Sequence, residues 1–293
     1  MAITPALRPS RYGVPVRSSI RSPLLAAAAC FLAFGVVLAF AYTITAAGRV
    51  DAIALHGLTA LDNSVSDLPA HVAVHSADPL PLLAMLGALF AWGWTTGRRR
   101  EAVGAVGLVA AANLIGLGLK MALAHPRYHQ ILGGQQVGAE AFPSGHATTA
   151  MSIALAAVLV APPRARVGVA FGAAAYVIAV ATSLLVLSWH FPSDVLGGLL
   201  LSSGFFFLAL AAVREGAGRR AGVVAQRARL ALSPGLGGIG VALMAAAGLL
   251  ALSRADELMA FARLHTVAAA TALALMVISA GLVASATLIA DRY

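Results

Sequence analysis

The sequence has few charged residues and a single cysteine. Charged residues make up 11% of the 293 residues, hydrophobic residues make up 60%, and the mean hydropathy is +0.88. A soluble protein of this length could not cover its surface with so few charges, so the composition indicates a polytopic membrane protein. Cys30 lies inside an apolar run and has no second cysteine to pair with, which excludes an intrachain disulfide and a cysteine-based metal site.

Eight apolar runs approach the roughly 20 residues that a membrane-spanning helix needs. We therefore predict an all-α fold, a polytopic transmembrane helical bundle of about eight helices. Six or seven helices would also fit, because only short polar breaks separate the runs between residues 144 and 213. The runs lie near residues 24–47, 79–97, 102–123, 144–161, 167–188, 193–213, 232–252 and 265–288.

The formal net charge of +9 could indicate a nucleic-acid partner, but the placement of the basic residues explains it. If eight helices alternate in direction, fifteen of the 20 Lys and Arg residues fall on one side of the membrane. Such a bias marks the cytoplasmic side, so both termini are predicted to be cytoplasmic and no nucleic-acid partner is predicted. The fifteen are Arg8, Arg11, Arg17, Arg21, Arg98, Arg99, Arg100, Arg164, Arg166, Arg214, Arg219, Arg220, Arg227, Arg229 and Arg292; the others are Arg49, Lys120, Arg127, Arg254 and Arg263.

Three polar clusters lie at predicted helix ends on the opposite side, and polar residues kept there in a membrane protein are functional candidates. The first is Lys120 to Arg127, about two helical turns apart, which can equally be a snorkelling lysine and a loop arginine. The second opens a helix at Ser144, a plausible N-cap, with His146 in the first turn. A helix N-terminus presents free N–H groups and a positive dipole end, which suits a phosphate.

The third cluster runs from His190 to Asp194, between two predicted helices. Asp194 lies near the first turn of the second helix, close enough to accept a hydrogen bond from His190. A carboxylate fixes the tautomer of an imidazole and stabilises the imidazolium, which activates the other ring nitrogen as nucleophile or base. A helix cap beside an uninvolved histidine would have the same sequence, but three such clusters on one side favour a site.

The three clusters together resemble the motifs of the type-2 phosphatidic acid phosphatase superfamily, which also includes the vanadium haloperoxidases. The resemblance covers roughly residues 80–215, and the second motif and the His-x-x-x-Asp pair are its specific parts. The matching segments are Lys120-(six residues)-Arg127, Pro143-Ser144-Gly145-His146 and Ser183…His190-(three residues)-Asp194.

The resemblance implies a reaction that needs neither metal nor cofactor. His190 would attack phosphorus and form a phosphohistidine, oriented by Asp194, and His146 would protonate the leaving oxygen. The remaining expected substrate-binding residues are Lys120, Arg127, Ser144, Gly145 and Ser183.

Two positions depart from the family pattern. Tyr128 stands where a proline usually follows the arginine of the first motif. Leu184 stands where the third motif has a phosphate-clamping arginine, and no Lys or Arg occurs between Arg166 and Arg214. Losing one such donor typically costs about 3 kcal/mol, or roughly 10²–10³ in rate. Either another group substitutes, for which His125 and His129 beside Arg127 are the candidates, or the enzyme is slow or specialised, or the chain is a non-catalytic relative.

The predicted function is therefore hydrolysis of a lipid-linked phosphate or diphosphate at the extracytoplasmic face. Phosphatidate, phosphatidylglycerophosphate, polyprenyl phosphates or diphosphates, and a polyprenyl-phosphosugar phosphate are candidate substrates. A phosphotransferase with a lipid or sugar acceptor and a degenerate lipid-binding relative are the alternatives. A transporter is disfavoured because the ionisable residues gather at one interface. A metal site is not predicted, because His71, His75, His125 and His129 match no strong ligand spacing.

The chain is divided into four segments on this basis. Residues 1–23 form a cytoplasmic N-terminal segment and 24–213 a six-helix catalytic membrane core. Residues 214–231 form a cytoplasmic linker, and 232–293 contain two additional transmembrane helices. The loops 48–78 and 124–143 would cover the site, and apolar residues from Ile53 to Leu61 predict a short interfacial helix. The lysine-poor, Ala- and Arg-rich composition resembles that of high-GC bacteria and favours a bacterial cell membrane.

Overall fold

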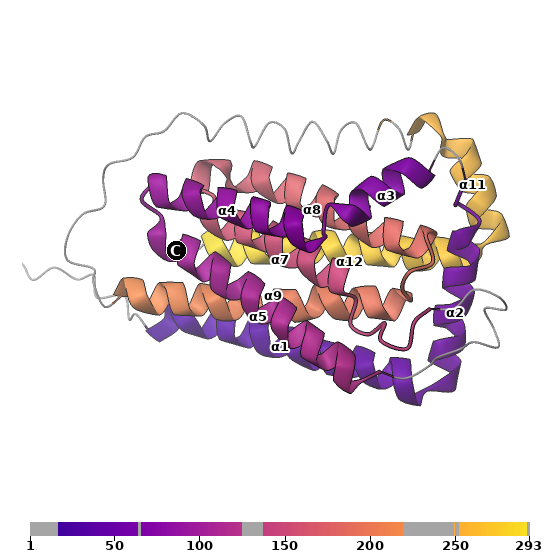
Figure 1. Ribbon diagram of the computed structural model, residues 1–293, viewed down its shortest axis with the longest axis horizontal. Helices are drawn as coiled ribbons and strands as arrows, with labels where there is room; N and C mark the ends of the chain where they lie inside the picture. The colour runs from indigo at the N-terminus through magenta and orange to yellow at the C-terminus, as the bar shows by residue number, and fades with distance from the viewer. Residues whose placement is uncertain (1–16, 64–65, 125–136, 219–248, 250–251, 292–293) are drawn as a thin grey trace, which may run out of the picture.

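The computed structural model describes residues 17–63, 66–124, 137–218, 249 and 252–291, and within these residues it contains ten helices and no strand. The prediction of an all-α bundle is confirmed. Figure 1 shows most of the helices lying side by side along the long axis, with α2 and α11 across one end. The helices are α1 (Arg17–Thr43), α2 (Thr45–Thr59), α3 (Asp67–His75), α4 (Pro79–Thr95), α5 (Arg99–Ala122), α7 (Gly145–Val160), α8 (Pro163–Val186), α9 (Pro192–Gly218), α11 (Ala255–Leu264) and α12 (Thr266–Asp291).

Seven of the eight predicted runs coincide with helices. Five described helices are long and apolar enough to span a membrane, namely α1, α5, α8, α9 and α12. α4 is shorter and joins α3 at a bend of 59°, and the pair would make a sixth span. The predicted helix 232–252 falls almost wholly outside the described residues. The chain is thus a multi-pass membrane protein.

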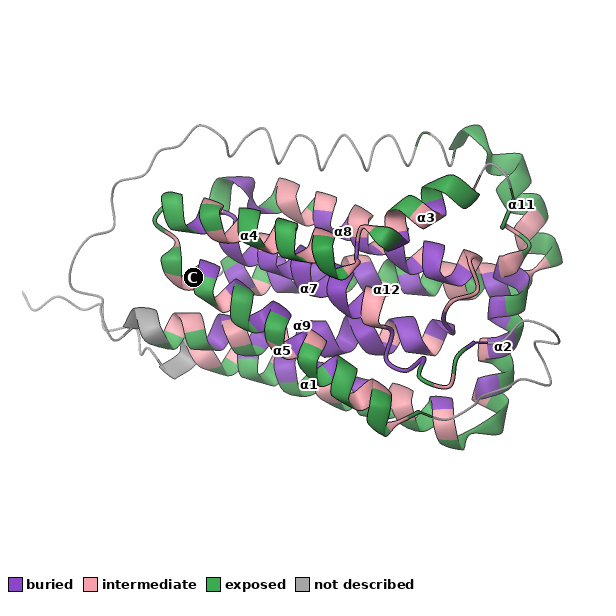
Figure 2. Cartoon of the chain, in the orientation of Figure 1, coloured by how far each residue is buried: buried purple, intermediate pink, exposed green. Residues whose placement is uncertain are grey.

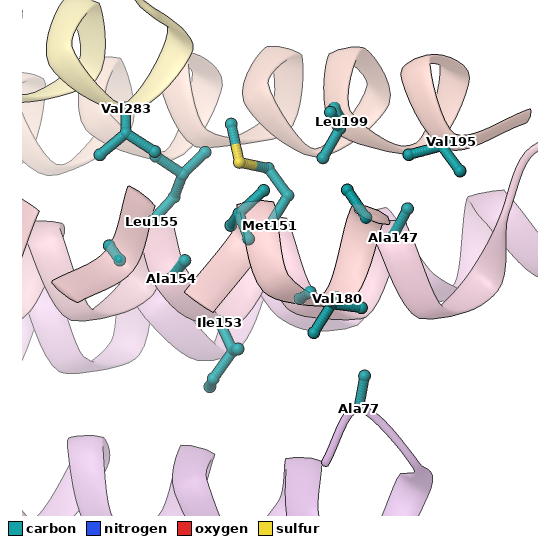
Figure 3. Close-up of a cluster of buried hydrophobic side chains, with 14 of the residues drawn as sticks. Ala77, Ala147, Met151, Ile153, Ala154, Leu155, Val180, Val195, Leu199 and Val283 are labelled. Atoms are coloured by element: carbon teal, nitrogen blue, oxygen red, sulfur yellow. The ribbon is translucent and has the colours of Figure 1, made fainter. Parts of the chain in front are cut away.

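The short helix α7 lies at the centre of the bundle. It packs against α4, α5, α8 and α9, and nearly all of its residues are buried, as Figure 2 shows by its purple colour. Figure 3 shows Met151 directed toward α9, where Leu199 lies, while Ile153 points away from α9. Because α7 is surrounded by protein, it does not have to match the thickness of the lipid by itself.

α9 crosses α7 closely near the start of both helices, and two glycines make this approach feasible. A Cβ atom at Gly198 would lie 2.8 Å from the carbonyl oxygen of Ser144 and 2.9 Å from the amide nitrogen of Thr148. A Cβ atom at Gly197 would lie 2.8 Å from the ring of Phe142. Any side chain at Gly198 would therefore push against backbone, which cannot move aside as a flexible side chain can.

The region 48–78 is more helical than the sequence predicts. The expected short helix is present as α2, with Leu55 and Leu58 buried and Ile53 exposed. α3 was predicted as loop, and it ends at the link that leads into α4. α2 packs against α12, which also contacts α8, α9 and α7, so the last helix is part of the same bundle.

The helix crossing generates a stability prediction. Gly198→Ala is expected to destabilise the protein by about 1–3 kcal/mol, because the new methyl group overpacks the backbone of α7. Gly118→Ala is the matched control, since a Cβ atom at Gly118 meets nothing within 4 Å. Thermal unfolding in detergent measures both variants. Equal unfolding midpoints for Gly198→Ala and Gly118→Ala would contradict the assigned role of Gly198.

Candidate functional site

The first part of the site is the N-terminus of α7. Ser144 has extended backbone angles and its hydroxyl accepts a hydrogen bond from the N–H of Ala147 (3.3 Å), so the predicted N-cap is confirmed. Gly145 is the first residue of α7, and a side chain there would meet nothing within 4 Å. The Phe142–Pro143 peptide bond is cis. The helix start therefore presents backbone N–H groups beside an open position, as anion binding at a helix N-terminus requires.

The second part follows the end of α8, where the chain reverses in a Schellman motif. The N–H of Trp189 donates to the carbonyl of Leu184 (3.0 Å), and the N–H of Ser188 donates to the carbonyl of Leu185 (3.1 Å). Ser188 has a φ of +59°, a left-handed conformation that glycine usually supplies at this position. This turn directs Trp189 and His190 toward the start of α7.

His190 and Asp194 lie together, but their contact differs from the expected hydrogen bond. Nδ1 of His190 is 3.7 Å from Oδ2 of Asp194, which is longer than a hydrogen bond. The same Oδ2 accepts the N–H of Phe191 at 2.9 Å. Both side chains are buried, and Nδ1 of His190 has no hydrogen-bond partner among the described residues. Asp194 thus caps its own helix and also provides a negative charge beside the imidazole.

Backbone contacts join the two parts. The N–H of Ser144 donates to the carbonyl oxygen of Asp194 (2.9 Å), and Gly198 allows α9 to lie directly against Ser144. The second and third motifs, which are far apart in the sequence, therefore meet at one end of the bundle. His190 is also close enough to His146 for the charge on one ring to act on the other.

His146 has a carboxylate partner that sequence reasoning did not assign to it. Its Nε2 lies 3.1 Å from Oδ1 of Asp78, and Oδ2 of Asp78 lies 2.9 Å from Nδ1 of His75. Asp78 stands in the link between α3 and α4, and these hydrogen bonds from His75 and His146 lower the pKa of its carboxyl. Asp78 is therefore an anion that bridges two imidazoles.

Trp189 packs at the centre of a histidine cluster. Its ring lies edge-on to those of His71, His75 and His146, with centroid distances of 6.1, 5.8 and 5.6 Å. The rings of His71 and His75 stack at 5.8 Å, and His71 also pairs with Asp67 at 3.3 Å. α3 thus brings two more imidazoles next to His146.

The predicted phosphate-binding residues are only partly within the described structure. Lys120 lies in the last turn of α5, near enough to His146 for its charge to act there. His125, Arg127 and His129 lie outside the described residues. Ser183 is buried in the last turns of α8, and its carbonyl accepts the N–H of Leu187. Leu184 is completely buried in the apolar core, so the side chain that replaces the expected arginine packs rather than binds.

Asp51 of α2 holds the first turn of α9. Its two carboxylate oxygens accept hydrogen bonds from the N–H of Ser193 (3.0 Å) and from the hydroxyl of Ser193 (2.6 Å). A carboxylate at a helix N-terminus also interacts favourably with the helix dipole. Asp51 therefore fixes the segment that carries His190 and Asp194.

The histidine cluster around Trp189 is not arranged as a metal site. Within residues 17–63, 66–124, 137–218 and 252–291, no group of three or more His, Cys, Asp or Glu side chains is arranged to hold a metal ion.

An apolar multi-helix bundle with this arrangement at one end defines a membrane protein of the phosphatase type. Residues 101–216 match the model of the PAP2 superfamily, in agreement with the resemblance seen in the motifs. The matched segment contains Lys120, Ser144, His146, His190 and Asp194, as the motifs predict. The comparisons found no match to a curated protein or to a solved structure.

Sequence reasoning missed Asp78, Trp189 and Asp51 as residues of the site. The pairing of His75 with Asp78 could have been predicted from the sequence, because the two residues are only three positions apart, and side chains at that spacing can meet. Trp189 directly precedes His190, and an aromatic residue at that position could have been considered. Asp51 had no local signal, because its partner Ser193 lies 142 residues further along the chain.

The capping contact of Asp51 generates a stability prediction. Asp51→Ala is expected to destabilise the protein by about 1–3 kcal/mol, because the charge-assisted hydrogen bonds to Ser193 are lost. Asp62→Ala, at an exposed position beyond α2, is the control. Thermal unfolding in detergent measures the loss. Equal midpoints for the two variants would show that α9 does not need this cap.

Proposed function

We propose that the protein hydrolyses a lipid-linked phosphate through a phosphohistidine on His190. One observation carries the proposal: His190 and Asp194 meet the N-terminus of α7 with His146, joined by the backbone bond from Ser144 to Asp194. A nucleophile, a carboxylate that orients it, a second histidine and an anion-binding helix end are the parts that phosphoryl transfer needs. They lie at one end of an apolar bundle, where a lipid headgroup would be found.

The reaction would proceed in two displacements. Nε2 of His190 attacks phosphorus while the bond from phosphorus to the lipid oxygen breaks, and the leaving oxygen takes a proton from His146. Water then attacks phosphorus, gives its proton to His146 and displaces the imidazole, so that inorganic phosphate leaves and both histidines return to their starting states. Asp194 balances the positive charge on His190, and Lys120, Arg127 and the N–H group of Gly145 stabilise the phosphoryl oxygens.

The absence of an arginine at position 184 bears on how much negative charge the substrate carries. With Leu184 in place of a guanidinium, fewer fixed cations face the phosphoryl group, which favours a phosphomonoester over a more highly charged diphosphate. His75 lies beside His146 and Asp78, and α3 thereby adds imidazole donors next to the site. Phosphatidate, phosphatidylglycerophosphate and polyprenyl phosphate all satisfy this requirement.

A groove beside the site offers a route for the lipid chain. It lies between α1, α2, α9 and α12, has a volume of about 520 Å³ and reaches Pro192 and Ser193, which follow His190 closely in the sequence. Val37, Phe40 and Leu196 are among its apolar lining residues. The headgroup would enter the site from the extracytoplasmic face while its chain stays between the helices. A transferase would share the first displacement, with an alcohol acceptor in place of water.

The first test measures phosphate release from a panel of lipid phosphates in the presence of EDTA. The wild-type protein is expected to release phosphate, and His190→Ala is expected to lose at least about 10³-fold in rate because the nucleophile is gone. His56→Ala, at an exposed position of α2, is the matched control and should keep full activity. Release by His190→Ala at the wild-type rate, or loss of wild-type activity with EDTA, would sink the mechanism. Absence of release from every lipid would favour the transferase or the non-catalytic relative.

The second test concerns the bridge through Asp78. The carboxylate stabilises the charged form of His146, which must carry a proton to protonate the leaving group. In Asp78→Asn the basic limb of the pH–rate profile is therefore expected to move to lower pH, with a drop of about tenfold at neutral pH. His75→Gln keeps the bond between Asp78 and His146 and should leave the limb nearly in place. An unchanged profile in Asp78→Asn would remove Asp78 from the mechanism.

A further inference from the structure

The end of the bundle opposite to the candidate site carries an apolar groove. It lies between α5 and α9 beside the end of α4, and its volume is about 660 Å³, within the range of roughly 300–1,000 Å³ typical of small-molecule sites. Val103 and Leu108 of α5 and Phe205, Leu208 and Ala212 of α9 contribute its apolar walls. Leu208 and Val103 are exposed, so the groove opens to the outside of the bundle.

Small residues on α5 leave this space open. A Cβ atom at Gly107 would meet nothing within 4 Å, and Gly107 lines the groove. A Cβ atom at Gly104, one turn earlier, would lie 2.8 Å from Cγ2 of Val213. The glycines therefore allow α9 to approach at one point and leave a hollow at the next.

Three arginines at this end bind to helix ends within the protein. Arg98 pairs with Glu101 (3.0 Å) and donates to the carbonyl of Leu159 (3.2 Å). Arg166 is buried and pairs with Asp291 at 2.5 Å, and Arg214 donates to the carbonyl of Ile289. Their charges are used on carbonyl groups near helix C-termini and on the carboxylates of Glu101, in the first turn of α5, and Asp291, at the end of α12.

Arg99 and Arg100 are arranged differently, because both line the groove. The guanidinium of Arg99 lies 4.8 Å from the ring centroid of Trp94, which also borders the groove. Neither arginine forms an ion pair with a carboxylate in the part of the chain that the structure describes. An apolar channel that ends at two uncompensated guanidinium groups and an indole ring is complementary to an anionic amphiphile.

We propose that this groove binds an anionic phospholipid, with its phosphate at Arg99 and Arg100 and one acyl chain along α5 and α9. A second copy of the chain is a poorer occupant. A two-fold axis along the membrane normal would bring the arginines of both copies together, and like charges repel. The proposed lipid site is separate from the candidate active site and does not depend on the proposed reaction.

Native mass spectrometry of the full chain tests the charge requirement, with phosphatidylglycerol and phosphatidylcholine as probes. The wild-type protein should retain phosphatidylglycerol in preference to phosphatidylcholine. The Arg99→Gln/Arg100→Gln variant should bind phosphatidylglycerol at least about tenfold more weakly, with phosphatidylcholine unaffected. Arg164→Gln removes an exposed arginine near the same end but outside the groove, and it should behave as wild type. Equal retention of both lipids by wild type, or an equal loss in Arg164→Gln, would overturn the proposal.

A second pair of variants tests the groove itself. Gly107→Leu should fill the groove and lower the bound phosphatidylglycerol about tenfold. Gly118→Leu, an exposed position with open space further along α5, should leave binding unchanged. Light scattering on the same samples gives the oligomeric state. If Gly107→Leu dissolves a dimer and leaves lipid binding intact, the groove is a protein contact and the lipid site is wrong.

Discussion

The geometry of the candidate site depends on the close crossing of α7 and α9. At the crossing the N–H of Ser144 donates to the carbonyl of Asp194, while Gly198 brings the backbone of α9 against Ser144 and Thr148. The two helix starts can lie this close because residue 198 is a glycine, since a Cβ atom there would push the two helices apart. The relative position of His146 and His190 therefore depends mainly on backbone contacts rather than on flexible side chains.

The surroundings of α7 reinforce this rigidity. Polar groups of α7 bond to neighbouring helices: the hydroxyl of Thr149 donates to Oδ1 of Asn113 (2.7 Å), and the backbone carbonyl of Thr148 accepts the hydroxyl of Ser202 of α9 (2.9 Å). Asn113 also donates to Ser152, so it ties α5 to α7 well inside the bundle. Satisfied polar groups in an apolar interior fix one arrangement of the helices. In the proposed reaction, such a fixed arrangement would hold the groups that face the phosphoryl oxygens in place.

Whether a feature could be predicted from the sequence depends on how far apart along the chain the interacting residues lie. The apolar runs, the N-cap at Ser144 and the start of α9 before Asp194 depend on neighbours in the chain, and the structure has them as expected. The bridge from His146 to Asp78 and the cap from Asp51 depend on how distant helices come together, and no local pattern contains that information. The hydrogen bond expected between His190 and Asp194 was wrong in detail: the two atoms lie 3.7 Å apart, and the same carboxylate oxygen accepts the N–H of Phe191. α3 was missed because polar residues and a proline interrupt its apolar pattern.

The family match and the residues that complete the site cover different parts of the chain. The match begins at residue 101, whereas Asp51, His75 and Asp78 come before it. Within the match, Leu184 stands at the position of the expected arginine. Its side chain is completely buried in the apolar core and supplies no charge to the candidate site. An imidazole cluster from α3, held by Asp67 and Asp78 and packed on Trp189, stands close to His146 instead. Imidazole donors are weaker phosphate ligands than a guanidinium, because they lack the bidentate fork and the permanent charge. Under the proposed function, the imidazoles of α3 would therefore supply only part of the phosphate contact that a guanidinium at position 184 would give.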